Sequence, residues 1–397
     1  MTTWRLAQLT SGTPDGRCHS HSYYDIPVLD ANGQRVLVHE LRFAERDPAP
    51  GDAVRVGIAS LDAAGVSFLG ESRAWSWQQG PMAQWVRTAA GERAVFNDRD
   101  PGGGEGDRFV ARLVDPDAGA VRTLPRPVYA VAPDGRFALG LNMARLDTLR
   151  PGYGYVGGAG ARLDERAPRD DGVWRIDLET GEARLLLSLA AAASFVQARL
   201  AAPRRLRQAV LPPHFWFNHV KLSPNGRRLT VKLRWRRLSG GWNDRQGVSL
   251  TADAETGGDL RLLADATSHV VWLNEDELYA WRAPEVALYR DAPGGGARLR
   301  RIAPDRLTHN VHMRHLPPGA AETLGEAVYD TPYREEIDLY HYDDRTGEEA
   351  LMARFPGHRP ARGPYRCDLH PVPSADGRTV IVTSMRDGGR QVYALTR

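Results

Sequence analysis

Four histidines of this chain recur at one register: His219, His269, His312 and His370. Each stands seven residues before the last residue of a short turn, as His219 stands before the Ser-Pro-Asn-Gly turn at 223–226. Imidazole titrates near neutral pH and is a common metal ligand. If successive repeats surround an axis, these histidines meet there. They would then bind a divalent metal such as Mn²⁺, Zn²⁺ or Fe²⁺, or accept a proton as a general base.

The last two repeats add candidate ligands and carboxylate-binding groups. Cys367 precedes His370 by three residues, and both would approach one cation if the backbone bends there. Arg366 precedes them, and Arg314 lies on the same strand face as His312. A guanidinium group can bind both oxygens of a carboxylate. These residues therefore predict a metal site beside an anion-binding site.

Polar and aromatic residues also gather near the N-terminus. His21 and Tyr23 lie in the His-Ser-His-Ser-Tyr-Tyr-Asp stretch at 19–25, and Gln79 lies in Trp-Ser-Trp-Gln-Gln-Gly at 75–80. Binding sites combine apolar and aromatic walls with a few polar groups. Aromatic rings can stack on a sugar, and amides can bind its hydroxyl groups. We therefore predict that His21, Tyr23 and Gln79 bind the substrate.

The elements that position these residues form a repeat. The histidine register extends to Ile26, Gln84 and Val128, and apolar runs such as Thr-Val-Ile-Val-Thr at 379–383 follow most turns. Later turns, such as Arg-Thr-Gly-Glu at 345–348, predict a second hairpin in each unit. Seven units of roughly 40–60 residues with four strands each predict an all-β fold, a seven-bladed β-propeller. A β-sandwich or two smaller β domains would not explain one register over the whole length.

The chain is expected to form one propeller over residues 1–397. The stretch at 4–10 is predicted as the outer strand of the last blade. Residues 143–213 are predicted as a partly helical insertion between blades 3 and 4, with a glycine-rich loop at 150–160 and a helix at 187–210. This insertion either covers one mouth of the channel as a lid or lies on the outer surface without a role in the site.

Composition limits the classes of function. The net charge is only +3 and no basic patch is interleaved with aromatics, so we expect no nucleic-acid partner. No signal peptide or bilayer-spanning stretch is evident, which predicts a cytoplasmic monomer or homodimer without a membrane partner. Cys18 and Cys367 give no disulfide framework. No phosphate-binding loop or nucleophile elbow occurs.

Two sets of motifs resemble known propellers. The Ser-Pro-Asn-Gly turn at 223–226 and the Ala-Pro-Asp-Gly turn at 132–135 resemble the WD40-like repeats of Tol-system propellers. The Arg-Cys-Asp-Leu-His-Pro stretch at 366–371, with the later Asp-Gly-Gly-Arg-Gln at 387–391, resembles the oligogalacturonate lyases. Those are seven-bladed cytoplasmic enzymes that cleave uronic-acid oligosaccharides by β-elimination.

The lyase resemblance assigns roles by position. It implies His312 and His370 as manganese ligands, with Cys367 where that family has glutamine and Val372 where it has its last histidine. His269 would match a catalytic histidine. The catalytic arginine would be Arg234 or Arg236, both on the strand after His219. The two changed ligands imply a site of different geometry.

These observations predict a metal-assisted lyase acting on acidic oligosaccharides. A divalent cation, with Mn²⁺ favoured and Zn²⁺ or Fe²⁺ as alternatives, and an arginine would neutralise the uronate carboxylate. His269 or His219 would transfer the proton. The alternatives are a non-catalytic propeller that binds a glycan or a protein partner, and a metal-dependent isomerase or epimerase acting on a sugar acid.

Overall fold

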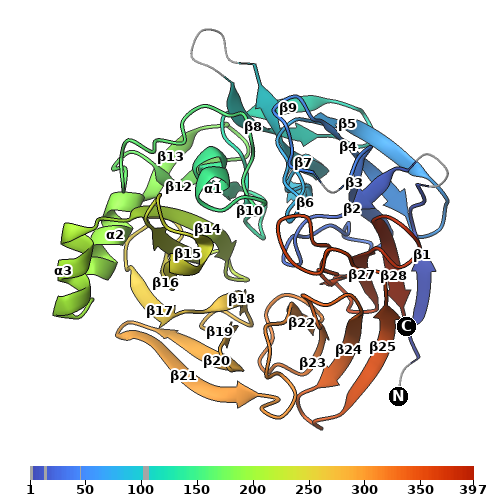
Figure 1. Cartoon of the computed structure of the whole chain (residues 1–397). Coiled ribbons are helices and arrows are strands. Elements are labelled where there is room, and N and C mark those ends of the chain that lie inside the picture. The colour runs from blue at the N-terminus through green and yellow to red at the C-terminus, as the bar shows by residue number, and fades with distance from the viewer. Residues whose placement is uncertain (1–2, 13–15, 45, 102–106) are drawn as a thin grey trace.

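The chain folds into a ring of seven antiparallel sheets. The computed structural model describes residues 3–12, 16–44, 46–101 and 107–397. Within them, seven four-stranded sheets surround a central axis (Figure 1). The all-β, seven-bladed propeller is therefore confirmed. By blade, the strands are β2 Cys18–Ser20, β3 Arg35–Leu41, β4 Val54–Ser60 and β5 Val66–Ser72; β6 Gln84–Thr88, β7 Gly91–Asp100, β8 Arg108–Val114 and β9 Val121–Leu124; β10 Ala130–Val131, β11 Phe137–Gly140, β12 Gly172–Asp177 and β13 Ala183–Ser188; β14 His214–Leu222, β15 Arg228–Arg236, β16 Gln246–Asp253 and β17 Arg261–Asp265; β18 Ser268–Trp272, β19 Glu277–Arg282, β20 Glu285–Ala292 and β21 Gly295–Ile302; β22 Met313–Leu316, β23 Glu326–Asp330, β24 Ile337–Asp343 and β25 Glu349–Phe355; β26 Val372–Pro373, β27 Thr379–Ser384, β28 Gln391–Thr396 and β1 Arg5–Gln8.

The two ends of the chain close the ring in one blade. Strand β1 pairs antiparallel with β28, with Arg5 opposite Thr396 and Gln8 opposite Tyr393. The predicted N-terminal outer strand of the last blade is thus confirmed. Because the ring is closed, every blade packs against two neighbouring blades.

The segment at 143–213 contains two separate excursions. It includes β12 and β13, which are the outer strands of blade 3 and are joined by the turn at 179–182. A helix, α1 Met143–Leu149, and a long loop precede these strands, while α2 Leu189–Gln197 and α3 Ala202–Val210 follow them. The helix expected at 187–210 is therefore two helices, because the chain leaves helical geometry near Leu200 and restarts with Pro203 in its first turn.

The two excursions lie in different parts of the molecule. Helices α2 and α3 sit at the rim of the ring, whereas α1 lies toward its centre (Figure 1). The loop after α1 carries Tyr153, whose ring lies 6.3 Å from that of Tyr23 and 5.5 Å from that of His219. The loop after α1, rather than α2 or α3, thus contacts the predicted site. A shorter 3-10 helix, Trp242–Asp244, precedes β16, and no helix of the described residues is long and apolar enough to cross a bilayer.

Candidate functional site

Three of the four in-register histidines have a left-handed backbone. The φ angles of His219, His269 and His370 are 54°, 48° and 48°. This conformation is uncommon outside glycine and costs free energy. In β14 and β18 it coincides with β-bulges, between Asn218 and Lys221 and between Ser268 and Val271. A bulge redirects a side chain, and repeated strain at matched positions favours a functional role.

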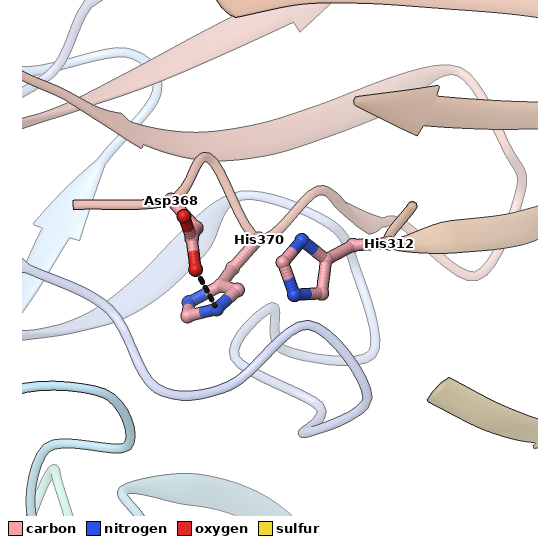
Figure 2. Close-up of side chains that lie close together, drawn as sticks. All are labelled: His312, Asp368 and His370. Atoms are coloured by element: carbon pink, nitrogen blue, oxygen red, sulfur yellow. Dashed lines mark ion pairs between the residues drawn. The ribbon is translucent and has the colours of Figure 1, made fainter. Parts of the chain in front are cut away.

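The inner ends of blades 6 and 7 bring together a potential metal site. His312, Asp368 and His370 each offer one ligand atom, and these atoms lie within 4.8 Å of one another (Figure 2). All three side chains are buried. In the described chain, His312 Nε2, His370 Nε2 and Asp368 Oδ1 have no hydrogen-bond partner. Buried polar atoms without partners are rare and costly, so a cation held by two imidazoles and a carboxylate fits this set.

Asp330 fixes the orientation of His312. Its Oδ1 and Oδ2 lie 3.1 and 3.0 Å from His312 Nδ1, and Oδ1 also accepts the His312 backbone N–H at 2.9 Å. With Nδ1 engaged, Nε2 is left for a ligand. This carboxylate–histidine pair is the usual support of a metal-bound imidazole. Burial lowers the pKa of His312, but the Asp330 carboxylate outweighs burial and raises it above the ordinary value.

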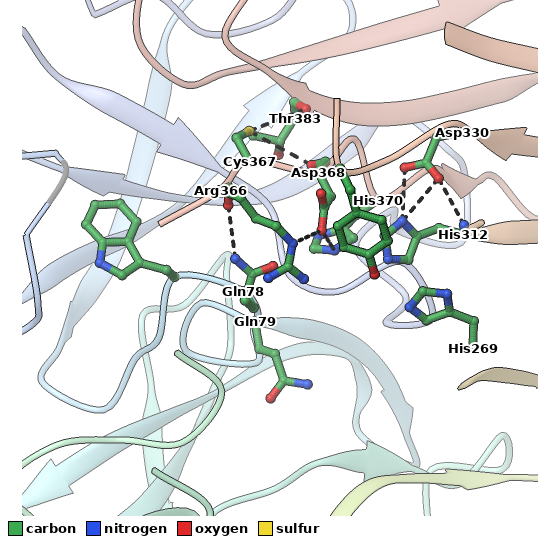
Figure 3. Close-up of polar contacts among 12 residues, drawn as sticks. Gln78, Gln79, His269, His312, Asp330, Arg366, Cys367, Asp368, His370 and Thr383 are labelled. Atoms are coloured by element: carbon green, nitrogen blue, oxygen red, sulfur yellow. Dashed lines mark hydrogen bonds and ion pairs between the residues drawn. The ribbon is translucent and has the colours of Figure 1, made fainter. Parts of the chain in front are cut away.

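Arg366 lies on the other side of Asp368. Its Nε donates to Asp368 Oδ2 at 2.8 Å (Figure 3), and its Nη2 donates to the Tyr153 hydroxyl at 2.9 Å. Burial raises the pKa of Tyr153, but Arg150 and Arg366 outweigh it and lower that pKa to about 8. Two guanidinium groups thus contact Tyr153, and that of Arg366 also contacts the potential metal ligand Asp368. This arrangement suits an anionic ligand.

His269 and His219 form the neighbouring wall. The His269 ring lies 4.2 Å from that of His312, and its Nδ1 is 2.7 Å from the carbonyl oxygen of Val311. Nδ1 must therefore donate, which leaves Nε2 with a lone pair. Burial, followed by the charge of His312, lowers the pKa of His269 well below its ordinary value. His269 is thus neutral and can accept a proton at Nε2.

His219 has the opposite pattern of contacts. Its Nδ1 lies 2.7 Å from the Tyr129 hydroxyl, which itself accepts from Gln79 Nε2. Burial and Arg150 lower the pKa of His219 well below its ordinary value. With the phenol donating to Nδ1, His219 carries its proton on Nε2 and is a hydrogen-bond donor. Tyr23 stacks on it at 5.0 Å with an interplanar angle of 11°.

A small cavity and a wide cleft adjoin this wall. The cavity has a volume of about 20 Å³, enough for one water molecule, and Tyr23, His219 and His269 are among its lining residues. It shares Lys232 and Arg234 with a cleft of about 1330 Å³ that opens between blade 4, blade 5 and α2. Among the described residues, the cleft lining holds seven arginines and a lysine but one carboxylate. Three of these arginines form ion pairs with carboxylates, Arg261 with Asp259, Arg282 with Asp265 and Arg298 with Glu285. The remaining excess of positive charge favours an anionic ligand.

The structure separates the predicted site residues into two groups. His219, His269, His312, His370, Tyr23, Gln79, Arg234 and Arg366 lie at the centre of the ring, on the walls described above. The remaining predicted residues, Cys367, Arg236, Arg314 and His21, have contacts of a different kind.

Cys367 does not join the group of ligand atoms. Its Sγ lies 3.9 Å from the carbonyl oxygen of Asp368 and 3.8 Å from that of Thr383, and burial raises the pKa of the thiol to about 11. A thiol must lose its proton to bind a metal, so this environment disfavours Cys367 as a ligand. Asp368, the next residue, supplies the third ligand atom of the group.

Arg236, Arg314 and His21 bind backbone oxygens. Arg236 donates to the carbonyls of Leu149 at 3.2 Å and Gly240 at 2.9 Å, so of the two predicted arginines Arg234 alone lines the cavity. Arg314 donates to the Tyr24 carbonyl at 2.9 Å. His21 Nδ1 lies 2.6 Å from the carbonyl of Ser22, and burial lowers its pKa to about 4. These contacts favour structural roles for Arg236 and Arg314.

The sequence did not single out Asp330, and it predicted the loop at 150–160 without assigning Arg150 or Tyr153 to the site. Asp330 ends β23 and contacts His312, the residue before β22, only in the folded blade. In the sequence it is one carboxylate among many, and no pattern distinguishes it. The loop after α1 is a glycine-rich stretch, whose contacts depend on the whole ring. Asp368 was detectable from its spacing of two residues before His370, although residues 366–371 form no strand in the structure.

Comparison with known proteins gives a likeness in fold. No family model matches the sequence, and no curated protein matches it either. An oligogalacturonate lyase solved in complex with manganese superposes with a TM-score of 0.57 at 12% identity, covering 100% of this chain and 96% of that one. The oligogalacturonate lyase of Vibrio parahaemolyticus gives the same TM-score and identity, covering 100% and 97%. The chain thus shares its seven-bladed fold with oligogalacturonate lyases over its whole length.

Proposed function

We propose that this protein is a metal-dependent lyase that cleaves uronic-acid-containing oligosaccharides by β-elimination. The observation that carries the proposal is the convergence of three buried ligand atoms, on His312, Asp368 and His370, beside Arg366 and the neutral His269. The fold likeness to a manganese-bound oligogalacturonate lyase supports it by analogy. We further propose Mn²⁺ as the metal, with Zn²⁺ and Fe²⁺ as alternatives.

Each residue has one task in the proposed reaction. The metal, held by His312, Asp368 and His370, would withdraw charge from the uronate carboxylate and so acidify the neighbouring C–H bond. Arg366 would hold the same carboxylate by hydrogen bonds. His269 would take the proton at Nε2, which is free to accept because Nδ1 donates to Val311.

The other residues would position the substrate. Arg234 lines both the cavity and the basic cleft, so it would bind a second acidic sugar that enters through the cleft. Tyr23 and Gln79 would bind the sugar ring and its hydroxyls. The acidic oligosaccharide partner and the cytoplasmic compartment belong to this proposal as well.

Metal analysis and an ultraviolet assay test the proposal together. The purified protein should contain one equivalent of a divalent metal, and an oligogalacturonate should yield an unsaturated product that absorbs in the ultraviolet. His312→Ala should lose both, whereas His341→Ala, on the surface of the same blade and paired with Glu326, should lose neither. Binding of the oligosaccharide without any product would support the non-catalytic propeller instead.

A further inference from the structure

Lysine occurs at only two positions of this chain. Among 52 lysines and arginines, Lys221 and Lys232 are the only lysines. Both are buried in blade 4, on β14 and β15, and both line the small cavity beside His219 and His269. Arginine supplies the positive charge everywhere else in the sequence. Two lysines that border one cavity therefore indicate a property that arginine lacks.

That property is either a compact charge or a releasable proton. A lysine ammonium carries three N–H donors and can release a proton, whereas a guanidinium remains charged in proteins. Lys221 uses its charge structurally: its Nζ lies 2.9 Å from Asp25 Oδ2 and 3.0 Å from the Tyr24 hydroxyl. Among the described residues no carboxylate forms an ion pair with Lys232, so Lys232 has a different role.

Thr267 holds Lys232 by two hydrogen bonds. The ammonium donates to the Thr267 carbonyl oxygen and, at 3.0 Å, to Thr267 Oγ1. Ser249 Oγ lies 2.7 Å from the same Oγ1 and fixes that hydroxyl. Two of the three N–H groups are thus occupied by one residue. The third is left for the cavity and the cleft, both of which Lys232 lines.

The charges around Lys232 make it a better acid. Burial lowers the pKa of its ammonium well below the ordinary value, and the nearby Arg234, Arg150 and Arg245 add to that effect. Asp265 opposes it, more weakly than burial, Arg234 or Arg150. A lysine with a lowered pKa releases its proton more readily than an exposed lysine does.

We propose that Lys232 is a further catalytic residue, which donates the proton to the leaving oxygen of the substrate. The inference rests on the proposed function. His269 takes the α-proton, the C–H electron pair forms the new C=C bond, and the C–O bond to the departing sugar breaks with its electrons on oxygen. That oxygen takes a proton from the Lys232 ammonium and leaves as an alcohol. Lys232 and His269 then return to their starting states by proton exchange with water in the cleft.

Kinetics with two leaving groups distinguish acid catalysis from a structural role. Lys232→Arg keeps the charge but cannot release a proton, so kcat on an oligogalacturonate should fall at least about 100-fold with a small change in KM. On a 4-O-aryl uronide, whose phenolate leaves without protonation, the same variant should lose less than about 10-fold. Equal losses on both substrates, or kcat within about twofold of wild type, would overturn the proposal. Unchanged Mn²⁺ affinity of the variant shows that the propeller is folded.

The scarcity of lysine allows a test that needs no activity. Protein grown with ¹³C-lysine should give two lysine signals, assigned from Lys221→Arg and Lys232→Arg. Arg136→Lys adds a reference lysine at an exposed turn. The Lys232 signal should titrate below the reference and shift when oligogalacturonate is added. A Lys232 that titrates with the reference would overturn the inference even if the wild type is an active lyase. A wild type that forms no product refutes the proposed function and, with it, the catalytic role of Lys232. A Lys232 signal that still titrates below the reference would then show that the failure lies in the proposed reaction and not in the lowered pKa of Lys232.

Discussion

Asp330→Asn tests whether His312 is a metal ligand held in place by its neighbour. The variant keeps the shape of the side chain but removes the charge that accepts from both His312 Nδ1 and the His312 backbone N–H, at 2.9–3.1 Å. Loss of such a supporting carboxylate typically weakens metal binding about 10- to 100-fold. Because each tenfold is about 1.4 kcal/mol, we expect a loss of about 1.4–2.8 kcal/mol of binding free energy.

The assay is Mn²⁺ affinity at fixed ionic strength, measured by competition with a chelator over a range of pH. A proton on His312 competes with the metal, so wild-type affinity should fall as the pH drops through the raised pKa of His312. In Asp330→Asn that pKa is lower, and the fall should move to lower pH. Asp338→Asn, on the same blade and bonded to Arg354, is the matched control. Equal affinities for Asp330→Asn and wild type would refute the assignment of His312.

Two further predictions concern the cysteine and the buried histidines. Cys367→Ser should keep the Mn²⁺ affinity within about threefold, because the thiol faces carbonyl oxygens. His370→Ala should lose about 100-fold or more of that affinity. A large loss of affinity in Cys367→Ser would show that the thiol is a ligand after all. Burial lowers the pKa of His21 and His315 to about 4 and that of His39 to about 3, so the unfolded chain binds protons between pH 6.5 and 4 that the folded chain does not. The free energy of unfolding should therefore be fully retained above pH 6.5 and should fall between pH 6.5 and 4, by up to about 4 kcal/mol per pH unit for three histidines. Urea titration at each pH measures it. A free energy of unfolding that does not change with pH would contradict the burial of these histidines in their neutral form.

The sequence could predict the fold because the repeat is local. An anchor residue and a turn seven residues later recur in every blade, an apolar run follows in most, and the N-terminal strand completes the last blade. The boundaries of the segment at 143–213 could not be predicted, because α1 and its loop interrupt blade 3 between β11 and β12. An insertion inside a blade leaves no break in the register of its neighbours.

The site was predictable where it follows the register and not elsewhere. His269, His312 and His370 converge because equivalent positions of adjacent blades face one axis. The choice between the adjacent Cys367 and Asp368 had only one signal in the sequence, the two-residue spacing of Asp368 to His370. The Cys367 thiol lies against carbonyl oxygens, while Asp368 offers an oxygen to the group.

A crystal of the protein grown with Mn²⁺ would test the central claim most directly. Diffraction data on both sides of the manganese absorption edge should give one anomalous peak, within bonding distance of His312 Nε2, His370 Nε2 and an Asp368 carboxylate oxygen. A peak bound by other residues, or fully loaded protein without a peak among these three side chains, would contradict the account.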